Sequence, residues 1–393
     1  MSLISKITAR KILDSRGSYT VEAKVHLTSG NVGVACVPEG KSKGENEAIS
    51  LPADEAVRNI EEKISPVLSR VSIENQTKID KELLHLDGTP NKSNLGANAL
   101  LAVSMASLKA ASVEYRTFLW KRISAVSDMK RSSFPRLYAN LINGGLHAGN
   151  NLPFQEYILI PKSNSPFEST NIIVSAYSNL REDLKRVYGP QATNVGDEGG
   201  FAPMLSDPIS PYTLIENAVS NLGYKDIVEY GMDAAANNSG KSVSELFNIY
   251  EKMLNSHNIV YLEDPFSEKD EDSFQRITAL FRHKVMISGD DITVTDKKRI
   301  SRLSQKGAIS AVIIKPNQIG TISEAIEAVK EARKNNISVV VSHRSGETND
   351  DFIADFAVGV GADGIKLGAP ARGERVSKYN RLLEIEREFT SGL

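Results

Sequence analysis

The chain has 393 residues, of which 40% are hydrophobic and 24% are charged, as in an ordinary globular protein. Its 47 basic and 49 acidic residues leave a net charge of −2, which excludes the basic surface typical of nucleic-acid-binding proteins. No run of about 18 apolar residues is present, so no membrane-spanning helix is expected. The single cysteine, Cys36, excludes an internal disulfide framework, and a start unlike a signal peptide predicts a cytoplasmic protein.

Residues 1–130 predict an α+β domain of their own. Between residues 9 and 38, apolar and polar side chains alternate and polar turns intervene, which is the pattern of an antiparallel meander. Residues 53–68 and 95–115 have the pattern of helices. Strands followed by helices favour a separate domain, and the polar stretch 127–136 is the expected boundary.

From about residue 225 the sequence repeats a unit of one strand and one helix. Six β-branched apolar runs have the character of buried parallel strands. Each run ends in a polar or charged residue, at intervals of 23 to 30 residues: Asp233, Glu263, Asp290, Lys315, His343 and Lys366. Amphipathic helices lie between the runs, and the clearest, 321–334, begins with a capping box of Thr321 and Glu324.

This spacing is typical of a (β/α)₈ TIM-type barrel, in which each parallel strand is followed by a helix. Residues 156–162 and 193–200 are expected to supply the two remaining strands, on either side of a helix at 169–189. The α/β barrel is therefore predicted to occupy residues 131–393, with a doubly wound open sheet as the alternative.

Charged side chains at the ends of buried strands need a chemical reason. The carboxyl ends of barrel strands form the active-site face, which brings Asp233, Glu263 and Asp290 together. Three converging carboxylates repel each other, and a hard divalent cation such as Mg²⁺ relieves that repulsion. The alternative is that each carboxylate caps the helix after its strand, but three in succession favour the metal.

Basic residues occupy the strand ends that follow. A lysine beside a bound cation has a lowered pKa and can act as a base, which makes Lys315 and Lys366 candidates; ordinary ion pairs are the alternative. Arg344 offers a planar fork for phosphate, and Ser345 can complete an anion cradle. A tight turn with an exposed arginine is the alternative for these two residues.

Two glycine-rich stretches lead to different interpretations. Asp197 and Glu198 lie between glycines, a setting that suits a general acid and equally an ordinary turn. Residues 359–364 match G-x-G-x-x-G, but they follow a helix and precede a strand, the reverse of the dinucleotide-binding order. We therefore expect residues 359–364 to be a loop from helix to strand.

An ordered set of motifs resembles the enolase family, phosphopyruvate hydratase, along nearly the whole chain. The matching segments are 14–17, 95–106, 142–150, 155–157, 194–203, 231–236, 262–266, 289–296, 314–321, 341–348 and 365–375. The resemblance implies an N-terminal α+β capping domain and a C-terminal barrel whose first turns depart from simple alternation. It also implies a homodimer that uses Mg²⁺ to dehydrate a small phosphorylated hydroxy acid, 2-phosphoglycerate, reversibly to phosphoenolpyruvate.

The resemblance further implies roles for the residues at the motif positions. Lys315 would take the C2 proton of the substrate, and Glu198, helped by Glu156, would assist loss of the C3 hydroxyl. The structural metal would be held by three carboxylates: Asp233, Glu263 and Asp290.

The remaining motif residues would bind the substrate. Lys366 would contact its carboxylate and, with Mg²⁺, stabilise the dianionic intermediate. Arg344 and Ser345 would hold the phosphate. His147 and His343 would line the pocket.

The sequence departs from the family pattern in the segments expected to cover the pocket. The family usually reads SGAST in an early loop where this chain reads EGKSK, so Glu39 replaces the serine that reaches a second metal. We interpret residues 37–48 as a mobile lid with hinge freedom at Gly40 and Gly44; a surface loop is the alternative. Glu39 then either binds the second Mg²⁺ on closure or marks a changed substrate.

Other departures accompany Glu39. Lys41 and Lys43 are expected to neutralise part of its charge when the lid is open. Leu146 replaces the serine of the family's GGSHAG motif, beside His147. The strand-end residues are thus kept while the covering segments have changed.

Three functions fit these observations. The first is an enolase of glycolysis with altered lids. The second is a paralogue that acts on a related phosphorylated or phosphonate substrate, because the core chemistry is kept and the lids differ. The third, an inactive enolase-like scaffold or binding protein, is disfavoured by the intact Lys315, Glu198 and metal acids.

Overall fold

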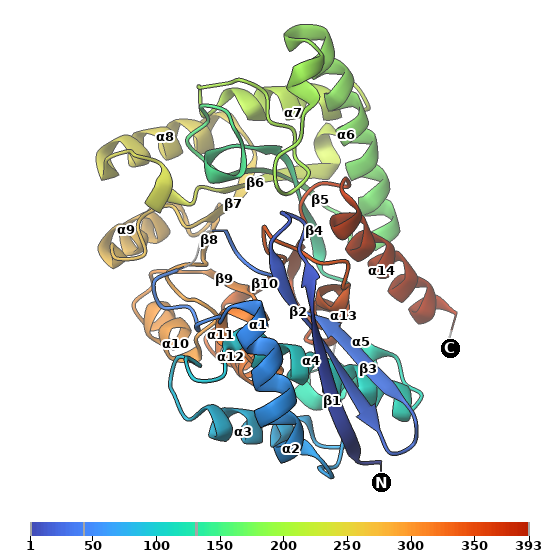
Figure 1. The fold of residues 1–393 in the computed structure, drawn as a ribbon. Coiled ribbons are helices and arrows are strands. Elements are labelled where there is room, and N and C mark those ends of the chain that lie inside the picture. Colours follow the sequence, from blue (N-terminus) through green and yellow to red (C-terminus); the bar gives the residue numbers. More distant parts are fainter. Residues whose placement is uncertain (1, 42–43, 130–132, 392–393) are drawn as a thin grey trace.

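The computed structural model describes residues 2–41, 44–129 and 133–391. Its N-terminal part is an antiparallel sheet in the order β1–β2–β3, accompanied by helices (Figure 1). The strands are β1 (Ile4–Leu13), β2 (Tyr19–Leu27) and β3 (Val32–Cys36). The helices are α1 (Ala53–Arg58), the π-helix η1 (Asn59–Ile64), α2 (Ser65–Leu68), α3 (Gln76–Asp87), α4 (Ala97–Glu114) and α5 (Leu119–Ser127). Strands precede helices, as predicted, and the expected domain boundary between residues 130 and 131 falls outside the described residues.

Helix α4 forms the centre of the N-terminal part and packs on β2 and β3. Its side chains Leu100, Val103 and Leu108 are fully buried in the core shared with the sheet. Gly33 in β3 permits this close approach, because a Cβ at that position would lie 2.1 Å from the carbonyl oxygen of Ala106. A side chain at residue 33 would therefore push the helix away from the sheet.

The C-terminal part is a closed barrel of eight strands in the order β10–β11–β4–β5–β6–β7–β8–β9. The strands are β4 (Arg136–Asn143), β5 (Glu156–Pro161), β6 (Val228–Asp233), β7 (Ile259–Glu263), β8 (Met286–Gly289), β9 (Ala311–Ile314), β10 (Ser338–Ser342) and β11 (Gly364–Lys366). β5 runs antiparallel to both of its neighbours, β4 and β6, whereas the other pairs are parallel. The barrel is therefore mixed, in line with the departure that the family resemblance implied.

The strand predicted at residues 193–200 is wrong. Thr193 ends the helix η3, and the rest of this stretch is irregular apart from a single bridge between Val195 and Phe201. Val195 is the one large apolar residue of this stretch and is 39% exposed, so residues 193–200 cannot fill a strand position in a barrel core. The eighth strand is instead β4, in which seven of eight residues are buried.

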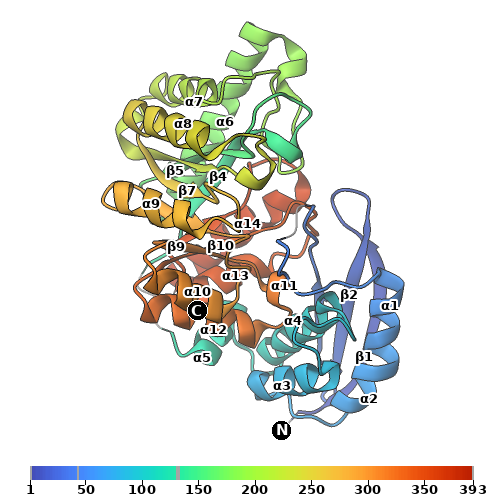
Figure 2. The ribbon, with the colours of Figure 1, turned by 90° about the vertical axis from the view of Figure 1, so that its left-hand side faces the viewer.

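Helices surround the barrel, and the N-terminal sheet lies to one side of it (Figure 2). These helices are η2 (Gly145–His147), α6 (Pro166–Tyr188), η3 (Pro190–Thr193), α7 (Ser210–Ser220), η4 (Lys225–Ile227), η5 (Ala236–Asn238), α8 (Val243–Ser256), α9 (Glu271–Phe281), α10 (Lys297–Gln305), α11 (Pro316–Ile319), α12 (Ile322–Lys334), α13 (Phe352–Gly359) and α14 (Gly373–Thr390). Half of the predicted capping box of α12 is present: Thr321 Oγ1 accepts the N–H of Glu324 at 3.3 Å and donates to its Oε2 at 2.8 Å. Between these two residues of the described chain, the reciprocal bond from the Thr321 N–H to the Glu324 side chain is not formed. The stretch 359–364 links α13 to β11, as expected. Within the described chain, no helix combines the length and apolarity needed to cross a membrane.

The carboxyl end of the barrel collects the predicted strand-end side chains. Each of them is the last residue of its strand or follows that strand directly: Asp233, Glu263, Asp290, Lys315, His343 and Lys366. Glu156 reaches the same end by another route, because it is the first residue of the antiparallel strand β5. Strand direction thus adds a fourth carboxylate to the three that strand spacing predicted.

Candidate active site

A narrow cleft lined mainly by polar and charged side chains opens at this end of the barrel. Most of the residues singled out in the sequence line it: His147, Glu156, Glu198, Asp233, Asp290, Lys315, His343, Arg344, Ser345 and Lys366. Glu263 is fully buried and reaches the cleft through its contact with Lys366. Glu39 lies in the segment between β3 and α1 and is not part of the lining that the described residues form.

The Lys366 ammonium lies among three carboxylates. Its Nζ donates to Glu156 Oε1 at 3.0 Å, to Asp233 Oδ2 at 3.1 Å and to both oxygens of Glu263 at 2.9 Å. Burial and the neighbouring Asp233 raise the pKa of Glu263 to about 8. Glu156 Oε2 has no hydrogen-bond partner among the described residues. One cation for three buried acids leaves two carboxylates that must be neutralised, either by protons or by a further cation.

Asp290 and Lys315 form the neighbouring pair. Lys315 Nζ donates to Asp290 Oδ2, and Gln318 Nε2 donates to Asp290 Oδ1 at 2.8 Å. Burial acts to lower the pKa of Lys315, but the Asp290 carboxylate outweighs burial, and the pKa lies above its ordinary value. Lys315 is therefore an ammonium here. Its pKa can fall only if the negative charge of Asp290 is neutralised by another partner.

Sequence analysis did not single out Asp264, which follows Glu263 directly. Its two carboxylate oxygens accept the backbone N–H groups of Asp290 at 2.9 Å and Asp291 at 2.8 Å. Asp264 has a left-handed backbone, with φ of 40°, which turns its side chain back toward β8. Because its partners are main-chain groups of another strand, no sequence spacing could have indicated this contact.

The donor chemistry of the cleft fits a hard divalent cation. Carboxylate oxygens of Asp264, Asp290 and Asp291 lie within 4.8 Å of one another and could bind a metal. This cluster shares Asp290 with the predicted set of Asp233, Glu263 and Asp290. Both oxygens of Asp264 accept backbone N–H groups, whereas those of Asp290 accept the side chains of Lys315 and Gln318, so an ion at Asp290 would have to replace a side-chain donor.

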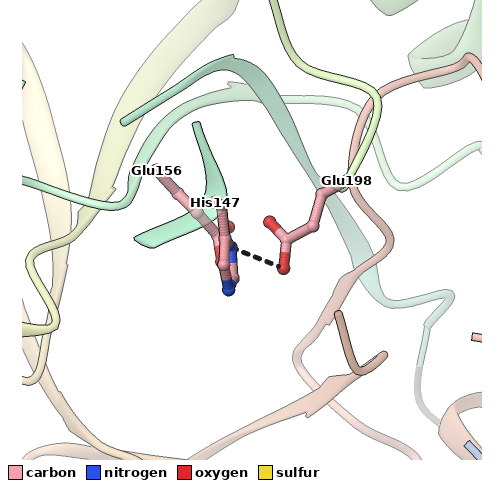
Figure 3. A group of neighbouring side chains, drawn as sticks. All are labelled: His147, Glu156 and Glu198. Atoms are coloured by element: carbon pink, nitrogen blue, oxygen red, sulfur yellow. Dashed lines mark ion pairs between the residues drawn. The ribbon is translucent and has the colours of Figure 1, made fainter. Parts of the chain in front are cut away.

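Glu198, His147 and Glu156 form a third group, in which Glu156 and His147 lie side by side and face Glu198 (Figure 3). Glu198 Oε1 lies 3.2 Å from His147 Nδ1, and its Oε2 accepts a hydrogen bond from Asn140 at 3.0 Å. Burial and the Glu198 charge raise the pKa of Glu156 well above its usual range. Burial also acts to raise the pKa of Glu198, but His147, His343 and Arg375 hold that pKa well below its usual range. The two acids thus share one proton, which rests on Glu156.

Arg375, which is fully buried, is a second residue that the sequence reading missed. Its guanidinium donates to His343 Nδ1 at 2.6 Å and to the carbonyl oxygens of Arg344 at 2.6 Å and Ser345 at 2.7 Å. Burial and the Arg375 charge hold the pKa of His343 well below its usual range. A neutral His343 therefore faces Glu198, with its Nε2 at 3.7 Å from Oε1. The only signal in the sequence was an arginine within the motif 365–375.

Arg344 is buried rather than exposed, which excludes the tight-turn alternative. Its guanidinium donates to both carboxylate oxygens of Glu47, each at 3.1 Å, and to Asn317 Oδ1 at 3.1 Å. The Oγ of Ser345 accepts the backbone N–H of Lys41 at 2.8 Å. Both residues expected to bind a phosphate therefore contact the segment between β3 and α1.

Comparison with known proteins agrees with this architecture. A family model described as "Enolase, N-terminal domain" matches residues 4–123, and one described as "Enolase, C-terminal TIM barrel domain" matches residues 131–242 and 236–392. The chain belongs to the enolase family. It is 40% identical to "Enolase B" of Dictyostelium discoideum, over 98% of this chain and 95% of the relative. It is 42% identical to "Enolase" of Aeropyrum pernix, over 98% and 94% of the two chains, and 42% identical to "Enolase" of Methanopyrus kandleri, over 99% and 96%.

The region where this chain departs from the enolase pattern lies over the cleft. The main chain of Glu39 pairs with that of Gly346, with N–O distances of 2.7 Å and 2.9 Å. Against the effect of burial, Glu47, then Asp290 and then Glu39 raise the pKa of Arg344. Glu39 belongs to neither metal-capable cluster of the described residues, and Lys43, its expected partner, lies outside them. The lid interpretation and the second metal remain predictions.

Proposed function

We propose that this member of the enolase family is a Mg²⁺-dependent hydro-lyase that interconverts 2-phosphoglycerate and phosphoenolpyruvate. The observation that carries the proposal is the placement of a lysine and two glutamates across the barrel. Lys315 follows β9 and Glu156 begins β5, and three strands separate β9 from β5 in either direction around the barrel. A base and an acid on opposite sides of one cleft suit loss of a proton and of a hydroxyl from adjacent carbons.

The basic residues of the cleft match the two anionic ends of such a substrate. The fork of Arg344, with Ser345 beside it, binds the phosphate by charge-assisted hydrogen bonds. Lys366 binds the substrate carboxylate and balances the second negative charge that develops there when the C2 proton leaves. His147 and His343, which adjoin Glu198, line the part of the cleft that receives the C3 hydroxyl.

The chemical step then involves two proton transfers. The neutral amine of Lys315 takes the C2 proton and becomes an ammonium, and the released electron pair forms the C2–C3 double bond. The Glu156–Glu198 pair delivers its proton to the C3 hydroxyl, which leaves as water. Because Glu156 holds the shared proton, we assign the donor to the pair, with Glu198 next to the histidines and Glu156 as the reservoir.

The acids of the cleft supply the metal site that this reaction needs. We propose that Asp233, Glu263 and Asp290 hold one structural Mg²⁺, with Asp291 as a neighbouring oxygen donor. Bound Mg²⁺ supplies the positive charge that offsets these acids and the substrate carboxylate. With Asp290 as a metal ligand, its attraction for the Lys315 ammonium would be weaker, and the amine of Lys315 could then act as the base. Glu39 would either hold a second, catalytic Mg²⁺ from the lid segment or mark a changed substrate.

A paralogue that acts on a related phosphorylated or phosphonate substrate is the second candidate function. The observation that favours it is confined to the lid, where Lys41 and Glu47 contact the cleft mouth. The strand-end chemistry would serve either substrate. We place both candidates in the cytoplasm as homodimers, as the family resemblance implies.

A coupled absorbance assay for phosphoenolpyruvate formed from 2-phosphoglycerate, with and without Mg²⁺, tests the proposal. We expect turnover at rates ordinary for enolases, with no turnover when Mg²⁺ is chelated. Turnover of a phosphonate analogue but not of 2-phosphoglycerate would support the paralogue instead. No reaction with either substrate, in protein that binds Mg²⁺ by calorimetry, would contradict both.

A further inference from the structure

One lysine of the lid segment, residues 37–48, bridges three loops at the mouth of the cleft. Lys41 Nζ donates to the carbonyl oxygen of Leu146 at 2.6 Å and to Asp197 Oδ2 at 3.3 Å. Its backbone N–H donates to Ser345 Oγ at 2.8 Å. Because these loops come from three separate parts of the barrel, Lys41 joins them only when the lid segment lies over the cleft.

Two of these contacts adjoin the acid side of the proposed site. Leu146 directly precedes His147, and Asp197 directly precedes Glu198. His147 and Glu198 form an ion pair with Nδ1 and Oε1 at 3.2 Å, so their two loops must keep a fixed spacing. The Lys41 ammonium contacts the residue that precedes each of them, Leu146 and Asp197, and so holds the same two loops together. It therefore links closure of the lid to the geometry of the proton-donating group.

We infer that Lys41 is a positioning residue that holds the lid segment closed and keeps the His147 and Glu198 loops in register. Its effect on turnover rests on the proposed function, whereas its effect on the lid does not. The enolase pattern SGAST has alanine where EGKSK has Lys41, so this clamp is a property of this chain rather than of the pattern.

The other end of the lid segment is attached differently. The Glu47 carboxylate accepts two hydrogen bonds of 3.1 Å from the guanidinium of Arg344. A phosphate that binds Arg344 meets this carboxylate on the same guanidinium, so the Glu47 attachment weakens when substrate is bound. The contacts of the Lys41 ammonium, with Leu146 and Asp197, lie on other loops and are not in competition with the phosphate. Lys41 is thus the attachment that can persist in the loaded enzyme.

Hydrogen exchange of the lid, followed by mass spectrometry on the full-length protein, tests the clamp without any assumption about substrate. Lys41→Met removes the ammonium and keeps most of the side-chain length. Loss of a hydrogen bond from a charged group corresponds to about a five- to thirtyfold change in an equilibrium. We expect amide exchange within residues 37–48 to accelerate by about that factor, and Lys41→Arg to restore most of the protection.

The lid offers a matched control. Lys269 Nζ lies 2.6 Å from Glu45 Oε2 on the outer surface, and both side chains are more than half exposed, at 73% and 62%. Exposed pairs of this kind contribute little. Lys269→Met should therefore leave exchange in the lid unchanged. Equal exchange in the wild type and Lys41→Met, or equal acceleration in the two methionine variants, would overturn the inference.

A kinetic measurement then tests the link to the reaction. With 2-phosphoglycerate as substrate, we expect KM to rise by about five- to thirtyfold in Lys41→Met and kcat to fall less, with both unchanged in Lys269→Met. A change in lid exchange without a change in KM would overturn the positioning role. If the wild type does not turn over 2-phosphoglycerate, the proposed function fails, and the exchange measurement still decides whether Lys41 is a clamp.

Discussion

The acids at the carboxyl end of the barrel and the acids around helices α13 and α14 are buried to a similar degree, but they are paired differently. Near α14, Glu347 forms an ion pair with Lys378, with Oε2 and Nζ 2.9 Å apart. Its oxygens also accept the backbone N–H groups of Arg344 and Thr348, each at 3.1 Å. One acid therefore has one cation and enough donors for both oxygens.

The other pairs of this second region follow the same rule. Arg381 donates to both oxygens of Asp355, at 2.7 Å and 2.8 Å. Asp350 pairs with Lys109 at 2.6 Å and accepts the N–H groups of Cys36 and Phe352. We call these three pairs the structural ion pairs. Each joins separate elements of the fold, and in each of them both carboxylate oxygens of the buried acid accept donors. Arg381 also reaches Glu384 and Glu388, of which Glu384 is largely exposed.

In the cleft, by contrast, a single ammonium on Lys366 serves three carboxylates. One oxygen, Glu156 Oε2, has no partner among the described residues. An unbalanced buried charge costs free energy that the fold must supply elsewhere, so it marks a place where a ligand is expected. The difference teaches that burial and charge alone do not separate a structural acid from a functional one, whereas a donor for every carboxylate oxygen does.

The largest expected effect comes from removal of Lys315, the cleft lysine that the proposed mechanism uses as a base. Lys315→Ala should reduce exchange of the substrate C2 proton with solvent by about 10²–10⁴-fold, since general base catalysis is typically of that size. Calorimetry should still detect Mg²⁺ binding, because Asp290 remains. Proton exchange at the wild-type rate in this variant would show that another group is the base.

Local sequence patterns were sufficient to predict the strand ends of the cleft and the cap at Thr321. Six buried runs, each ending in a polar residue, correctly predicted six strand ends, because a β-branched run has few other ways to be buried. The cap at Thr321 was predicted correctly for the same reason: its partner, Glu324, is three residues away.

The rest of the cleft depends on topology, which local patterns do not reveal. Residues 193–200 were predicted as a strand because a barrel needed one, and the true strand, β4, lay upstream. Whether Glu156 reached the cleft depended on the antiparallel direction of β5. The hydrogen bonds of Arg375 and the pairing of Arg344 with Glu47 join residues far apart in the chain, and only the folded structure brings them together.

A second way to test the comparison is to remove one lysine from each region and measure unfolding by denaturant. Breaking a buried ion pair typically costs about 3–5 kcal/mol. Lys109→Met should lose that amount because Asp350 is left unpaired, and Mg²⁺ should not restore it. Lys366→Met should lose a similar amount in the absence of Mg²⁺ and regain much of it when Mg²⁺ is added, since a cation can replace the ammonium among the acids. If Mg²⁺ stabilised both variants by the same amount relative to the wild type, the distinction between the two regions would fail.

The smallest expected effect concerns protons in the cleft. Burial and Asp233 raise the pKa of Glu263 from 4.5 to about 8, so between these values the folded protein holds a proton that the unfolded chain has lost. The contribution of Glu263 to stability therefore falls as pH rises through this window. A cation requires the carboxylate form, so Mg²⁺ binding should release a fraction of a proton below pH 8 and the apparent affinity should rise with pH, by at most about tenfold per unit, before it levels off.

Calorimetry of Mg²⁺ binding in two buffers with different heats of ionisation measures this proton release directly. Glu263→Gln provides the control, because its amide cannot give up a proton, and its residual Mg²⁺ affinity should vary less with pH. The structural ion pairs provide the contrast: Asp350 has a lowered pKa, held down mainly by Lys109 against the effect of burial, so it carries no proton to release in the same window. An affinity that does not change between the ordinary pKa of Glu263 and pH 8 would mean that Glu263 is already ionised, and the raised pKa on which this prediction rests would be wrong.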